Sequence, residues 1–202
     1  SELQAFVTQA ASDAVAAALS TIQAFADDNG AVAPAPVLND YLLLGITDVD
    51  AGNLASIQSA LASTAVQASG LTSASDVQTL VNAFNSILAE ANGSATDATP
   101  GSNPTTATYA AIGATTAAGF ANGSAQQSLL NTVIGAQTTS GVDTVAKIEA
   151  LASRVAAILA TAAGTSPAQA LTVARRVAWN WLKAAKAWGP LKPAALSAHC
   201  WM

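Results

Sequence analysis

The sequence predicts an all-α protein in which tandem helical repeats form a helical bundle, with an amphipathic helix near the C-terminus. Three observations support this prediction. About half of the 202 residues are hydrophobic but only 5% are aromatic, so the apolar share is largely alanine and small aliphatics, and alanine has the highest helix propensity. Apolar residues recur at helical spacing, and turn glycines follow at comparable intervals. No segment competes as a strand by a two-residue alternation.

An internal repeat organises most of the chain. The segment Tyr41 to Gly45 returns 68 residues later as Tyr109 to Gly113, in the pattern Tyr-x-x-x-Gly. Each repeat reads as an opening turn of helix, a middle helix, a longer closing helix and a terminal glycine. We therefore expect units at residues 37–93 and 105–164, with residues 1–30 as the closing helix of a preceding repeat.

The closing helices carry the clearest pattern. One apolar stripe contains Val77, Leu80, Val81, Phe84, Ile87, Leu88 and Ala91, and a second contains Ile148, Leu151, Val155, Ile158, Leu159 and Ala162. Ser73 followed by Asp76 predicts a capping box at the start of the first. The terminal glycines, Gly30, Gly93 and Gly164, suit the left-handed position after a helix.

Middle helices are expected at about 53–66 and 124–135. In the first, Leu54, Ile57 and Leu61 should face inward; in the second, Leu129, Leu130, Val133 and Ile134. The segments 31–36 and 94–106, rich in Gly, Ser, Thr, Ala and Pro, predict linking loops.

Charge divides the chain near residues 165–167. The first 166 residues hold all twelve acidic residues and two basic ones, a net charge of −10, whereas residues 167–202 hold five basic residues and no acid. All four tryptophans lie in this tail. Pro167 and Gly189-Pro190 mark the start and stop of a basic amphipathic helix. We expect its apolar face to dock on the acidic bundle, with Trp181 and Leu182 as anchors; the alternative is an anionic membrane or a partner helix.

Membrane and export signals are not predicted. The chain lacks about 18 uninterrupted apolar residues, the length of a membrane span. The N-terminal segment carries Glu2 and Asp13 and no basic residue, so it does not read as a signal peptide.

Catalytic and metal chemistry find little support. Asp48 and Asp50 have the spacing of a calcium loop, but its twelfth position is Ser59, so we expect a helix cap and no metal or cofactor. The only His and Cys, His199 and Cys200, lie at the C-terminus, and no Gly-x-Ser-x-Gly elbow exists, so we expect no catalytic residue. The acidic body argues against nucleic acid as a partner.

The repeat carries a resemblance. Tyr-x-x-x-Gly, then Asn53-Leu54 or Ser128-Leu129-Leu130-Asn131, then Val142-Asp143-Thr144-Val145 with Ile148-x-x-Leu151-Ala152, resembles the alanine-rich helical repeats of very large bacterial surface proteins, the biofilm-type and RTX-type adhesins that Gram-negative bacteria export. The similarity covers about residues 1–165. The tail at 167–202 does not match; it is a terminal segment or sequence foreign to the repeat.

The resemblance implies a role without catalysis. We expect a spacer or interaction module of a secreted adhesin, located at the cell surface or outside the cell as part of a larger protein, with neighbouring repeats as its partners. The first alternative is a binding module whose tail, residues 167–188, engages an anionic membrane or a partner helix. An enzyme of unrecognised type is the third. The oligomeric state is left open.

Overall fold

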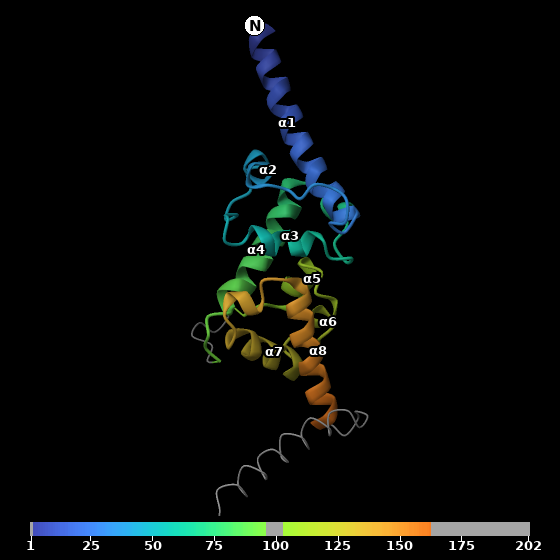
Figure 1. Cartoon of the computed structure of the whole chain (residues 1–202), viewed down its shortest axis with the longest axis vertical. Helices are drawn as coiled ribbons and strands as arrows, with labels where there is room; N and C mark the ends of the chain where they lie inside the picture. Colours follow the sequence, from blue (N-terminus) through green and yellow to red (C-terminus); the bar gives the residue numbers. More distant parts are fainter. Residues whose placement is uncertain (1, 96–102, 163–202) are drawn as a thin grey trace, which may run out of the picture. The chain divides into compact units, whose positions relative to one another are not determined.

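The protein is helical throughout the part of the chain that a computed structural model describes, residues 2–95 and 103–162. The described residues contain no strand, which confirms the all-α class (Figure 1). The helices are α1 (Glu2–Asp27), α2 (Leu38–Leu43), α3 (Leu54–Leu61), α4 (Ala74–Glu90), α5 (Thr106–Ala111), α6 (Thr115–Ala118), α7 (Ala125–Gly135) and α8 (Val145–Ala162), with 3₁₀ turns η1 (Ala68–Gly70) and η2 (Thr139–Gly141). The chain divides into two compact units, residues 1–156 and 157–202.

The two Tyr-x-x-x-Gly segments form short helices of the same design. Helices α2 and α5 are each followed by a glycine with positive φ, +71° at Gly45 and +76° at Gly113. The next backbone N–H turns back to the tyrosine carbonyl, at 2.9 Å from Ile46 to Tyr41 and at 2.9 Å from Ala114 to Tyr109. Only glycine takes this left-handed conformation without strain. Both tyrosines are buried.

The middle helices differ in length from each other and, in one case, from the expectation. Helix α7 begins after its N-cap Ser124, as expected, and buries Leu130 and Ile134. Helix α3 ends at Leu61, short of the expected residue 66. The chain turns after α3, where the Ser63 hydroxyl bonds to another segment, and this turn lets Val66 reach the core.

Helix α4 matches the predicted closing helix. Its N-cap Ser73 and Asp76 form the predicted capping box: Asp76 N–H donates to Ser73 Oγ at 3.3 Å, and Ser73 N–H donates to Asp76 Oδ2 at 2.9 Å. The apolar stripe from Val77 to Ile87 is buried. The helix ends at Glu90, and Gly93 follows with φ of +82°.

Helix α8 follows its predicted stripe only in its first part. Ile148, Ala152 and Val155 are buried, but Leu151 is half-buried and Ile158 is 59% exposed. The prediction of an inward-facing Ile158 is therefore wrong for the described residues, because burial depends on what packs against a position and not on its spacing alone.

Helix α1 is longer than the closing helix expected at residues 1–30. It spans 26 residues, against 17 in α4. Ala18, Ile22, Phe25 and Ala26 are buried, whereas every residue from 2 to 13 is exposed. By length and composition α1 is the one described helix that could cross a membrane. The sequence criterion of uninterrupted apolar residues did not select it.

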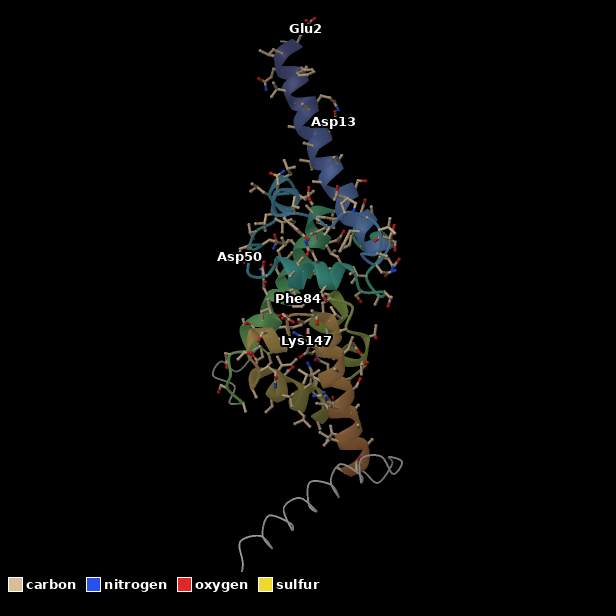
Figure 2. All side chains as sticks on the ribbon, viewed as in Figure 1. Glu2, Asp13, Asp50, Phe84 and Lys147 are labelled. Carbon is tan, nitrogen blue, oxygen red and sulfur yellow. The ribbon has the colours of Figure 1, made fainter. Side chains whose placement is uncertain are left out.

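Helices α1 and α4 occupy comparable positions in the packing. Helix α1 contacts α2 and α3, and α4 contacts α5 and α7, so each lies against the short helix and the middle helix that follow it. Helix α4 also packs on α3, which precedes it. It therefore takes part in both helical segments, 37–93 and 105–156, with the core residue Phe84 on it (Figure 2).

Candidate functional site: the junction around helix α4

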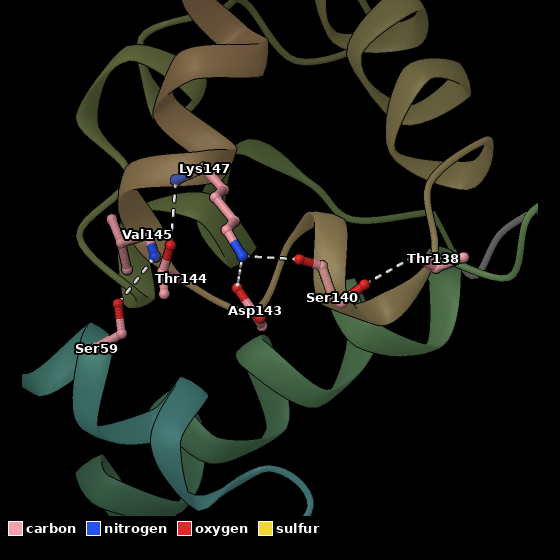
Figure 3. Close-up of polar contacts among 7 residues, drawn as sticks. All are labelled: Ser59, Thr138, Ser140, Asp143, Thr144, Val145 and Lys147. Carbon is pink, nitrogen blue, oxygen red and sulfur yellow. Dashed lines mark hydrogen bonds and ion pairs between the residues drawn. The ribbon is translucent and has the colours of Figure 1, made fainter.

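Side-chain hydroxyls join the two helical segments. Ser63, just after α3, donates its hydroxyl to the Gly113 carbonyl at 3.1 Å. Ser59 on α3 accepts a hydrogen bond from the Val145 N–H at 3.0 Å, at the start of α8 (Figure 3). Because small hydroxyl side chains make these bonds, the backbones can approach closely at both points.

Two glycines permit the closest approaches. A methyl group added at Gly113 would lie 2.2 Å from Ser63 Oγ and 2.8 Å from Ser63 Cβ. A methyl group at Gly135, the last residue of α7, would lie 2.6 Å from the Ser94 carbonyl oxygen. The Gly93 N–H also donates to the Gln137 carbonyl at 2.9 Å. The end of α4 is thereby bound to the end of α7.

Matched side-chain amides support the start of each short helix. Gln58 on α3 donates to the Pro36 carbonyl at 2.9 Å, and Asn131 on α7 donates to the Pro104 carbonyl at 3.0 Å. Pro36 and Pro104 are 68 residues apart, the spacing of the two tyrosines. Glutamine and asparagine differ in length, so sequence comparison did not pair them.

A second matched pair links each short helix to its closing helix. Gln78 on α4 accepts from the Thr47 N–H at 2.8 Å, and Glu149 on α8 accepts from the Thr116 N–H at 2.8 Å. Glu149, expected as a single surface acid, thus holds the start of α6. The equivalent contacts support the repeat, which stays a prediction.

The two buried tyrosines differ in their partners. The Tyr109 hydroxyl donates to Asn131 Oδ1 at 2.6 Å, whereas the Tyr41 hydroxyl is buried without a hydrogen-bond partner. Burial raises the pKa of both phenols above the ordinary value, with a smaller contribution from Asp40 at Tyr41 and Glu90 at Tyr109. Both phenols are therefore neutral at pH 7 and act as core anchors, in agreement with the interpretation from the sequence.

The predicted calcium-type loop forms a helix start. One Asp50 carboxylate oxygen accepts from the N–H groups of Gly52 and Asn53, at 2.7 and 3.1 Å. The Asp48 carbonyl accepts from the side-chain amides of Asn53 and Asn85, at 2.7 and 2.8 Å. Within residues 2–95 and 103–162, no three His, Cys, Asp or Glu side chains cluster where they could hold a metal ion.

A shallow cavity of about 450 Å³ lies between the segments, beside this loop, and Asp50 and Asp143 are among its lining residues. Asp143 pairs with Lys147 at 2.6 Å, and Lys147 also donates to the Ser140 carbonyl at 2.8 Å (Figure 3). Both residues of the ion pair are substantially exposed, and such pairs contribute about 0–1 kcal/mol. The cavity brings together no acid, base and nucleophile.

Asp28 is more than the solvated helix end that the sequence suggested. Its carboxylate accepts from the N–H groups of Gly30, at 2.8 Å, Val32, at 3.0 Å, and Ala33. The hydrogen bond from Ala33 is the main cause that lowers the pKa of Asp28 below its ordinary value, and those from Val32 and Gly30 add to it. Asp28 therefore organises the turn between α1 and α2.

The remaining predicted site residues lie outside the described part of the chain. These are the tail anchors Trp181 and Leu182 and the terminal pair His199 and Cys200. The docking of residues 167–188, on the bundle or on a membrane, stays a prediction.

Comparison with known proteins adds no relative. No family model, no curated protein and no solved structure matches this chain.

Proposed function

We propose that this chain is a structural spacer or interaction module of a bacterial surface adhesin, without catalytic chemistry of its own. The observation that carries the proposal is the position of α4, which packs on α3 in one helical segment and on α5 and α7 in the next. A helix common to two segments leaves no linker between them. Force applied along the chain would then load packed helices and not a flexible connection.

The polar contacts of the junction support the same role. Those of Ser59, Ser63 and Gly93 connect one segment to the other, and the carboxylates of Asp28, Asp50 and Asp76 accept backbone N–H groups. Most polar side chains named above have a structural partner, as expected of a module that transmits position. The location at the cell surface rests on the resemblance of the repeat to adhesins.

A display experiment tests the spacer role. The full chain is placed between a membrane anchor and a ligand-binding tip on a bacterial surface, and adhesion to a ligand-coated surface is measured under flow. We expect adhesion that is retained with the chain and reduced with Phe84→Ala, since truncating this buried ring on α4 costs about 3–5 kcal/mol. Exposed Val32→Ala is the matched control. Equal adhesion with Phe84→Ala, at equal surface level, would count against the proposal.

A further inference from the structure

The first half of α1 is an apolar face that no described residue covers. Leu3, Phe6 and Val7 are 74%, 72% and 53% exposed. They lie along the helix from Glu2 to Asp13, in the exposed half of α1 (Figure 2). Nine of the ten large hydrophobic residues that are exposed in the described chain lie between residues 3 and 43. Such a concentration of apolar surface is typical of an interaction site.

This face continues an interface that is already formed. Steps of three and four residues lead back from the buried Ile22 and Ala18 through Ala14, Ala11 and Val7. Residues at these steps share one side of a helix. The buried end packs on α2 and α3, and the free end offers the same stripe to a partner.

The order of large and small residues on the stripe identifies the partner. Positions 3, 6 and 7 carry leucine, phenylalanine and valine, and positions 10, 11 and 14 carry alanine. The two sets mirror each other about the point between residues 8 and 9. In two antiparallel copies, position 3 therefore faces 14, position 6 faces 11 and position 7 faces 10, so that every large side chain meets an alanine.

A parallel pair would fit poorly. It would place Phe6 against Phe6 and Ala11 against Ala11, which crowds one end and leaves a gap at the other, whereas alternating large and small residues fill the space between helices. Charge favours the same antiparallel arrangement. In it Glu2 faces Val15 and Asp13 faces Gln4, so that acidic residues do not face each other.

We propose that two copies of this chain associate through an antiparallel pair of α1 helices, with Leu3, Phe6 and Val7 of each copy packed against Ala14, Ala11 and Ala10 of the other. The arrangement is symmetric, since residue i contacts residue j in both directions. The paired stretch, residues 2–15, is about 21 Å long at about 1.5 Å per residue. This is small beside a standard interface, so association is weak and concentration-dependent. The inference does not depend on the spacer role.

Sedimentation velocity of the full chain over a range of concentrations tests the pairing. We expect a monomer–dimer equilibrium in the micromolar range. Phe6→Ser should raise the dissociation constant at least about tenfold, equivalent to about 1.4 kcal/mol. Val32→Ser, at a position 90% exposed outside the stripe, should leave it unchanged. A chain that stays monomeric at all concentrations would overturn the proposal.

Ala11→Phe separates specific pairing from general adhesiveness. It adds apolar surface but places a ring opposite Phe6 of the other copy, so we expect weaker dimerisation. Tighter association would overturn the antiparallel register, as would a monomer whose α1 binds phosphatidylcholine vesicles, because the face would then belong to a membrane. Circular dichroism checks that each variant keeps its helix content.

Cross-linking gives an independent measure of register. In a Cys200→Ser background, chains carrying Leu3→Cys are mixed with chains carrying Ala14→Cys and oxidised with diamide. The mixture should form disulfide dimers faster than Leu3→Cys chains alone. Faster cross-linking of Leu3→Cys alone would indicate a parallel pair and contradict the proposal.

Discussion

Gly113→Ala is the most direct perturbation of the junction, and Gly45→Ala is its matched control. Both glycines follow the short helix of a Tyr-x-x-x-Gly segment with nearly the same positive φ. They differ in surroundings, since a methyl group at Gly45 meets nothing within 4 Å but one at Gly113 meets Ser63 at 2.2 Å. The pair therefore separates backbone strain from the cost of forcing the two segments apart.

The magnitudes follow from these contacts. An alanine in the left-handed conformation costs about 1–2 kcal/mol, and we expect Gly45→Ala to lower the free energy of unfolding by that amount. Gly113→Ala adds the displacement of Ser63, about 1–3 kcal/mol for overpacking, and the loss of the hydrogen bond from Ser63 Oγ to the Gly113 carbonyl, about 0.5–1.5 kcal/mol. Its total cost should exceed that of the control by about 2–4 kcal/mol.

Equilibrium urea unfolding of the full chain, followed by circular dichroism, measures both costs from the midpoint and slope. Ser63→Gly removes the side chain that Gly113→Ala would meet, so the double variant should recover about 1–3 kcal/mol of the loss as an interaction energy. Equal costs for the two glycine variants, or no recovery in the double variant, would refute the close approach of Ser63 and Gly113.

Three further predictions concern single elements. Tyr109→Phe should cost about 1–3 kcal/mol, because it leaves the buried Asn131 oxygen without its donor, whereas Tyr41→Phe should cost less than about 0.5 kcal/mol, because that hydroxyl has no partner to lose; urea midpoints measure both, and equal losses would contradict the assignment. The pKa of Asp76 is lowered, first by its hydrogen bond from the Ser73 side chain, so its contribution to stability is present above the ordinary carboxyl pKa and is lost as pH falls through the lower folded pKa; melting temperatures from pH 2 to 6 should fall less steeply on acidification for Asp76→Asn, and an unchanged slope would argue against this cap. Leu80→Ala should cost about 2–5 kcal/mol, since Leu80 is buried, and Leu151→Ala should cost less because Leu151 is half-buried; thermal melts compare them, and a larger loss at the second position would reverse the order.

Several structural features were predictable because their causes are local. The stripe of α4, its cap at Ser73 and the turns after Tyr41 and Tyr109 depend on residues within a few positions of one another, so the sequence pattern determines them. The interpretation of Asp50 as a cap also rested on local spacing, and the structure agrees with it.

Other features required the tertiary structure because they depend on residues far apart in the chain. No local pattern indicates that Ser63 meets Gly113 or that Ser59 holds Val145, which are 50 and 86 residues apart. The same spacing rule that buries Ile87 on α4 predicted burial of Ile158, which is exposed. Periodicity reports which side of a helix is apolar, and only the neighbouring helices decide which parts of that side are covered. The sequence by itself thus determined the all-α class and the helix starts, whereas tertiary contacts decided the sharing of α4 and the free face of α1.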